Sequence, residues 1–85
     1  MAFVLKIKPK AEKKLDALND KDYARAMQIL SAIRDDPFSG KKLHGVHKEE
    51  YSVRVWPFRF LYKIYKHELL ISVIKFDHRK DAYKS

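Results

Sequence analysis

Hydrophobic residues in the first part of the chain are spaced as in one strand and one short helix. Residues 3–8 are rich in strand-forming residues and are followed by Pro9, so we expect a strand that ends there and pairs with a later segment. Beyond the proline, Ala11, Leu15 and Leu18 recur at helical spacing among charged residues. This pattern predicts a short amphipathic helix.

A second helix is predicted between Asn19 and Pro37. The dipeptide Asn19-Asp20 interrupts the first helix, and both residue types are common N-caps. Apolar residues then recur at the spacing of one helix face, which the core of a small domain would bury. They are Tyr23, Ala26, Met27, Leu30 and Ile33. The residue before a proline disfavours helical backbone, so we expect the helix to end at Asp35-Asp36.

The second half of the chain changes to the two-residue period of strands. Residues 38–50 hold both glycines and show no period, so we expect a loop. Residues 51–56 and 58–65 then alternate between apolar and polar side chains. Residues 69–76 are apolar on both sides apart from Ser72 and Lys75, as in a central strand. With a turn at Lys66-His67, these runs predict a three-stranded antiparallel meander.

Together these elements predict one α+β domain over residues 1–85, with an N-terminal strand, a helical hairpin and a meander. One sheet would pack on two helices. A chain of 85 residues is too short for two stable cores. Its longest apolar stretch is far shorter than the roughly 20 residues of a membrane span. Since no leader pattern is visible either, we expect a cytoplasmic protein. The sequence has no cysteine, which excludes disulfides, thiolate metal ligands and cysteine nucleophiles.

The net charge of +8 is concentrated in the second half of the chain. Residues 1–36 carry eight basic and six acidic side chains, whereas residues 37–85 carry eleven basic and five acidic ones. A concentrated positive potential favours nucleic acid or the ribosome as a partner. It does not distinguish a nuclease from a passive binder, or RNA from an acidic protein.

Basic and aromatic residues gather on one predicted face of the meander. Strand alternation puts Ser52, Arg54 and Trp56 on the face away from the helices. Arg54 and Arg59 flank the connection Trp56-Pro57. Guanidinium groups bind phosphate oxygens in a bidentate manner and stay charged, so we expect a phosphate clamp. The alternative is that both arginines only keep the sheet soluble.

Five short motifs, in this order and after a helical hairpin, resemble the RelE/ParE superfamily of toxins from microbial toxin-antitoxin pairs. They are Lys41-Lys42-Leu43-His44-Gly45, Tyr51-Ser52-Val53-Arg54-Val55, Phe58-Arg59-Phe60-Leu61-Tyr62, Ile71-Ser72-Val73-Ile74 and His78-Arg79-Lys80-Asp81-Ala82-Tyr83. The resemblance spans essentially the whole chain. It implies a compact, microbial-ribonuclease-like fold, no metal or other cofactor, and a short acidic RelB-like antitoxin as partner. In the RelE branch, which we favour, it also implies cleavage of mRNA in the ribosomal A site.

The resemblance assigns catalytic roles by position. Arg54, Arg59 and Arg79 match basic residues that stabilise charge on the phosphate, and Tyr83 matches a C-terminal tyrosine that stacks on a base or moves the 2′-hydroxyl proton. His78 adjoins this set, and imidazole exchanges protons near neutral pH, so we expect it to act as general acid. An ordinary surface histidine is the alternative.

A second group of residues is predicted to bind RNA without taking part in the chemistry. They are Lys41, Lys42, Ser52, Trp56 and Lys80. Trp56 could be an exposed stacking platform or a packing residue of the hairpin. Ser52 stands where RelE enzymes carry a lysine, so the basic cluster is thinner here. Two alternatives therefore stay open, namely a ParE-like inhibitor of DNA gyrase without catalysis and a decayed toxin that only binds its antitoxin.

Overall fold

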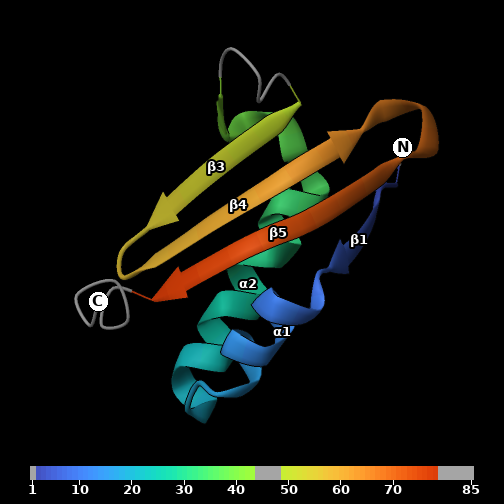
Figure 1. Ribbon diagram of the computed structural model, residues 1–85. Coiled ribbons are helices and arrows are strands. Elements are labelled where there is room, and N and C mark those ends of the chain that lie inside the picture. The colour runs from blue at the N-terminus through green and yellow to red at the C-terminus, as the bar shows by residue number, and fades with distance from the viewer. Residues whose placement is uncertain (1, 44–48, 79–85) are drawn as a thin grey trace.

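The computed structural model describes residues 2–43 and 49–78 as a mixed sheet with two helices on one face (Figure 1). The α+β class, the N-terminal strand, the helical hairpin and the meander are confirmed. In chain order the elements are β1 (Val4–Ile7), α1 (Pro9–Asp16), α2 (Asp20–Asp35), a 3-10 turn (Pro37–Ser39), β2 (Lys41–Lys42), β3 (Glu50–Val55), β4 (Phe58–Tyr65), a second 3-10 turn (Lys66–Glu68) and β5 (Leu70–His78).

The five described strands are ordered β1-β5-β4-β3-β2. The N-terminal strand pairs with a later segment, as expected, and that segment is β5. The two strands run parallel, whereas the other neighbours are antiparallel. The loop expected over residues 38–50 needs correction, because Lys41–Lys42 forms β2 and pairs with β3. Two residues are too few to show a period, so only the pairing partner reveals this strand.

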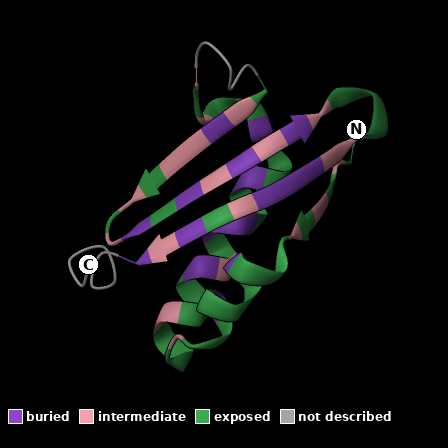
Figure 2. Ribbon diagram, in the orientation of Figure 1, coloured by how far each residue is buried: buried purple, intermediate pink, exposed green. Residues whose placement is uncertain are grey.

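The core lies between the sheet and the two helices. Along β4, buried positions alternate with exposed or half-buried ones, and the same alternation is visible as purple bands in Figure 2. Phe60 and Tyr62 of this strand are fully buried, as are Ile71 and Val73 of β5. One face of the sheet is therefore used for packing, and the other is left for solvent or a partner.

Both helices begin where the sequence predicts. Pro9 occupies the first turn of α1, and the Asn19 side chain caps α2 by accepting a hydrogen bond of 2.8 Å from the Asp22 backbone N–H. The predicted buried stripe of α2 needs two changes. Tyr23 is 40% exposed, because the start of α2 extends past the sheet in Figure 1, and Ile29 is buried in addition. Within the described residues, neither helix is long and apolar enough to cross a membrane.

A buried tyrosine holds the short strand β2 against β3. The Tyr62 hydroxyl donates a hydrogen bond of 2.6 Å to the Pro37 carbonyl oxygen. Burial raises the pKa of this hydroxyl to about 12, although a hydrogen bond from the Gly40 backbone partly opposes the shift. A Cβ at Gly40 would collide with the Tyr62 hydroxyl and lie 3.1 Å from the Ser52 carbonyl oxygen. Only glycine fits here, and this close approach places Lys41 beside Ser52.

Candidate nucleic-acid interface

Two arginines face each other on the sheet face opposite the helices. Arg54 of β3 and Arg59 of β4 are direct partners in the strand register, and both are exposed. Trp56, in the turn between them, is 67% exposed. Ser52 lies on the same face, opposite Leu61. The predicted placement of Ser52 and Arg54 on one face is thus confirmed, whereas Trp56 lies in the turn beyond the end of β3. We call the sheet face that carries these residues the open face.

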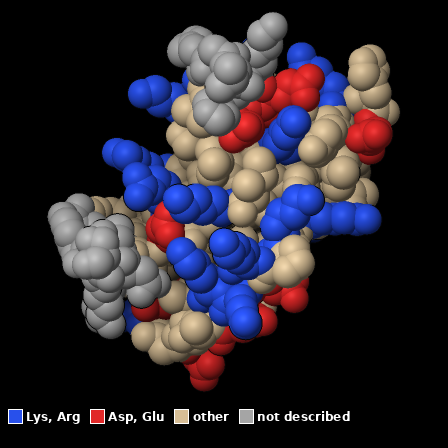
Figure 3. All heavy atoms as spheres, in the orientation of Figure 1, with Lys and Arg blue, Asp and Glu red and all other residues tan. Residues whose placement is uncertain are grey.

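The two predicted lysines of β2 point to different sides. Lys41 pairs with Ser52 and extends the open face, whereas Lys42 pairs with Tyr51, whose side chain is buried on the helix side. Figure 3, drawn in the orientation that looks onto the open face, shows lysine and arginine side chains gathered across its middle. Part of the positive charge expected from the sequence therefore lies on the open face.

A hollow of about 230 Å³ lies beside Arg59 on the open face. Its lining residues are Ser52, Arg59, Phe60, Leu61, Lys75 and Asp77. Two cationic side chains and one hydroxyl are the groups that bind phosphate oxygens in proteins. The hollow therefore brings together two cationic side chains and a hydroxyl group of this kind, together with one carboxylate.

Asp77 is the acidic residue of this hollow, and a lysine from α1 holds it. Lys14 Nζ donates a hydrogen bond of 2.9 Å to Asp77 Oδ1. Burial by itself raises the pKa of this carboxyl. The hydrogen bond and the charge of Lys14 lower it, as do the charges of Lys75 and Arg59. Together they outweigh burial and leave the pKa below its usual value. Asp77 is consequently ionised at neutral pH.

His78 does not lie on the open face beside the two arginines, as its predicted role would require, and that role as general acid stays a prediction. Its direct partner on β4 is Phe58, and both side chains are buried on the helix side. The imidazole Nε2 lies 3.7 Å from Asp22 Oδ2 of α2, and the ring packs edge-on against Phe58 with centroids 5.3 Å apart. This histidine packs in the core.

A β-bulge in β5 explains where His78 points. Leu61 pairs with Lys75, whereas the next residue, Tyr62, pairs with Val73, so Ile74 is an extra residue between the two pairs. A one-residue shift in register exchanges the two faces of a strand. Beyond the bulge the even-numbered residues turn inward, and the open face receives Lys75 and Asp77.

A family model places the chain among known toxins. The model described as "ParE toxin of type II toxin-antitoxin system, parDE" matches residues 5–83, which is nearly the whole sequence. The chain belongs to this toxin family. No curated protein matches the chain.

Solved structures of RelE proteins share the fold of this toxin. The RelBE2 toxin-antitoxin complex of Mycobacterium tuberculosis matches with a TM-score of 0.83 and 21% identity, over 93% of this chain and 100% of that chain. The archaeal RelE-RelB complex of Pyrococcus horikoshii matches with a TM-score of 0.78 and 22% identity, over 93% of this chain and 97% of that chain. The isolated RelE toxin of E. coli matches with a TM-score of 0.75 and 18% identity, over 99% of this chain and 97% of that chain. The predicted superfamily and its fold are confirmed.

The remaining predicted site residues of the toxin fall at the end of the chain. Arg79, Lys80 and Tyr83 lie outside the described residues, and their roles stay predictions. Conversely, the hollow contains Lys75 and Asp77, which sequence reasoning did not assign to the site. The sequence did carry a signal for Lys75, because it is one of two polar residues in an otherwise apolar strand.

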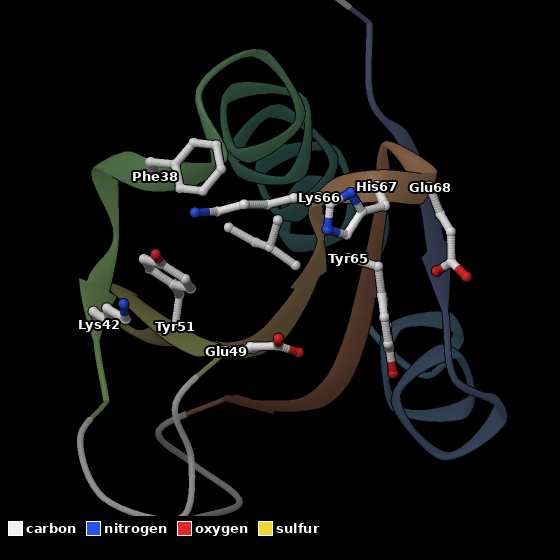
Figure 4. A pocket seen from close by; sticks show the side chains of 9 residues that line it. Phe38, Lys42, Glu49, Tyr51, Tyr65, Lys66, His67 and Glu68 are labelled. Atoms are coloured by element: carbon white, nitrogen blue, oxygen red, sulfur yellow. The ribbon is translucent and has the colours of Figure 1, made fainter.

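A larger pocket of about 400 Å³ lies at the opposite end of the sheet, beside the Lys66–Glu68 turn (Figure 4). Phe38, 44% exposed, forms part of its wall and contacts Tyr51 edge-on, with ring centroids 6.0 Å apart. Lys66 Nζ lies 5.5 Å from the Phe38 ring centroid. Lys42 lines this pocket and is therefore separate from the arginine pair.

Proposed function

We propose that this toxin is a metal-independent endoribonuclease that cleaves mRNA, with the ribosome holding the substrate, and thereby inhibits translation. The observation that carries the proposal is the direct opposition of Arg54 and Arg59 on the open face, beside the hollow that contains Lys75. Like charges directly opposite one another destabilise a strand pair. A polyanionic ligand lowers that cost, because its phosphates add negative charge beside the two guanidinium groups.

The proposed reaction uses the RNA's own 2′-hydroxyl as nucleophile. Its oxygen forms a bond to the adjacent phosphorus while the bond to the 5′-oxygen breaks, leaving a 2′,3′-cyclic phosphate and a 5′-hydroxyl. Negative charge accumulates on the non-bridging oxygens, and in this proposal Arg54, Arg59 and Lys75, which lie on the open face, stabilise it. Much of the rate would come from the ribosome bending the RNA into the in-line geometry of attack.

Two protons must also move in this reaction. One leaves the 2′-hydroxyl, and one reaches the departing 5′-oxygen. His78 is buried against Phe58 on the helix side, so we do not assign it either proton. Following the resemblance, we assign movement of the 2′-hydroxyl proton to solvent to Tyr83 and further charge stabilisation to Arg79, and solvent water supplies the proton that the departing 5′-oxygen takes up.

An antitoxin is the second partner of the proposal. The similar RelE proteins of Mycobacterium tuberculosis and Pyrococcus horikoshii were solved in complexes with their antitoxins. We infer that a short acidic RelB-like protein covers the open face of this toxin, because its charge complements the lysines and arginines gathered there.

Primer extension on mRNA tests the proposed cleavage. RNA from cells that express the wild-type toxin is expected to show cuts in phase with codons, and Arg59→Ala should reduce them strongly. Arg34→Ala removes an equal charge from the exposed side of α2 and should leave the cuts in place. Growth arrest without cuts, and with translation continuing, would overturn the proposal.

Inhibition of DNA gyrase is the second candidate function. Two observations favour it, namely the match to the ParE family model and the serine at position 52 in place of a lysine. A supercoiling assay with purified gyrase and toxin separates the candidates, since only a ParE-like toxin should stop supercoiling. A toxin that neither cuts mRNA, inhibits gyrase nor slows growth has kept only antitoxin binding.

A further inference from the structure

Lys14 of α1 contacts the carboxylate of Asp77, which lines the hollow beside Arg59. Lys14 and Asp77 are 63 positions apart in sequence, yet Nζ and Oδ1 lie 2.9 Å apart. The contact forms because β1 covers β5 only along Leu70–Val73, so the end of β5 lies next to α1. The Asp77 side chain is 15% exposed and that of Lys14 is 45% exposed.

Asp77 is an unfavourable neighbour for a bound phosphate. It lines the hollow together with Arg59 and is the direct cross-strand partner of that arginine. An ionised carboxylate there repels an anion and offsets the positive charge of Arg59 or Lys75. Lys14 compensates this charge from the side of the helix. Lys14 raises the net charge of this group from +1, for Arg59, Lys75 and Asp77, to +2.

We propose that Lys14 belongs to the RNA-binding site of this toxin, where it neutralises Asp77 so that the hollow between Arg59 and Lys75 accepts a phosphate of the RNA backbone. The inference rests on the proposed function and extends the interface from the sheet onto α1. Lys14 acts through Asp77 and is a positioning residue.

The rival explanation is that the ion pair merely fastens α1 to the sheet. The two explanations differ in what happens when both partners are removed. If Lys14 acts by neutralising Asp77, removing the carboxylate as well should restore binding, because nothing is left to neutralise. If the pair only fastens the helix, the double variant should be no better than either single variant, and the melting temperature should follow binding.

Binding of a short RNA tests this. The probe is a fluorescein-labelled single strand of about ten nucleotides carrying 2′-O-methyl groups, which block attack, and anisotropy is measured at low salt because salt weakens such contacts. Lys14→Met should weaken binding about threefold to tenfold, as expected for a partly exposed charge. Asp77→Asn should bind at least as tightly as wild type, and the double variant should return to within about twofold of Asp77→Asn. Thermal unfolding is recorded for each.

Two controls separate the failure of this inference from the failure of the proposed function. Lys13→Met removes the same charge from the neighbouring exposed position of α1 and should change binding less than about twofold. Arg59→Ala should abolish most binding. If it does not, the proposed site itself is wrong. If Arg59→Ala weakens binding but Lys14→Met does not, or Asp77→Asn fails to rescue it, the role of Lys14 is overturned and the site stands.

Discussion

Arg54 and Arg59 lie directly opposite one another across the β3–β4 hairpin, with both side chains exposed. Replacing either by alanine removes a charge-assisted contact to phosphate, typically worth about 1.5–3 kcal/mol, so RNA binding should fall about tenfold to hundredfold. For Arg54→Ala, stability should stay the same or rise slightly, because like-charge repulsion is relieved; Arg59→Ala also removes the cross-strand partner of Asp77, so its stability should stay the same or fall slightly. RNA titration and urea unfolding check the two parts. A loss of binding explained by unfolding would contradict this prediction.

Ser52→Lys should strengthen RNA binding. Ser52 lines the hollow with Arg59 and Lys75 and lies beside Lys41 of β2, so an added ammonium group would sit within the same anion site. We expect about a threefold to tenfold gain in affinity, a steeper salt dependence and more extensive mRNA cleavage. Ser52→Asp should have the opposite effect. Equal affinities for the two variants would show that RNA does not enter the hollow.

Gly40→Ala should destabilise the fold by about 1–3 kcal/mol. The new methyl group would collide with the Tyr62 hydroxyl and crowd the Ser52 carbonyl oxygen at 3.1 Å. Combining it with Tyr62→Phe removes the first of these contacts and should recover part of the loss. Urea unfolding of the four proteins in this cycle measures the coupling, and strictly additive effects would argue against direct contact.

Tyr62 should make stability fall at high pH. The folded protein raises the pKa of this hydroxyl to about 12, above the usual value near 10 expected in the unfolded chain. The stabilisation from this shift is fully present below about pH 10 and is lost as the pH rises toward 12, by about 2–3 kcal/mol in all. Tyr62→Phe removes this dependence. Its unfolding free energy is therefore expected to approach or exceed that of wild type above pH 11, and a constant difference between the two would refute the assignment.

Most of the fold was predictable because its signals are local. The cap at Asn19 and the prolines at positions 9 and 37 set the helix boundaries through backbone chemistry that neighbouring residues determine. The alternation of β3 and β4 likewise assigned Arg54 to the open face and Tyr51 to the core. Strand β2 was not predicted, because its two residues are too few to show a period.

The sequence by itself determined the order of the elements, the buried face of β4 and the arginine pair, because each depends on residues close together in the chain. Tertiary structure alone decided the far end of β5. There the extra residue Ile74 exchanges the two faces of the strand, so His78 turns toward α2 and Asp77 turns toward Arg59 and reaches Lys14. A bulge depends on how two strands pair across the sheet, and no periodicity within one strand records it.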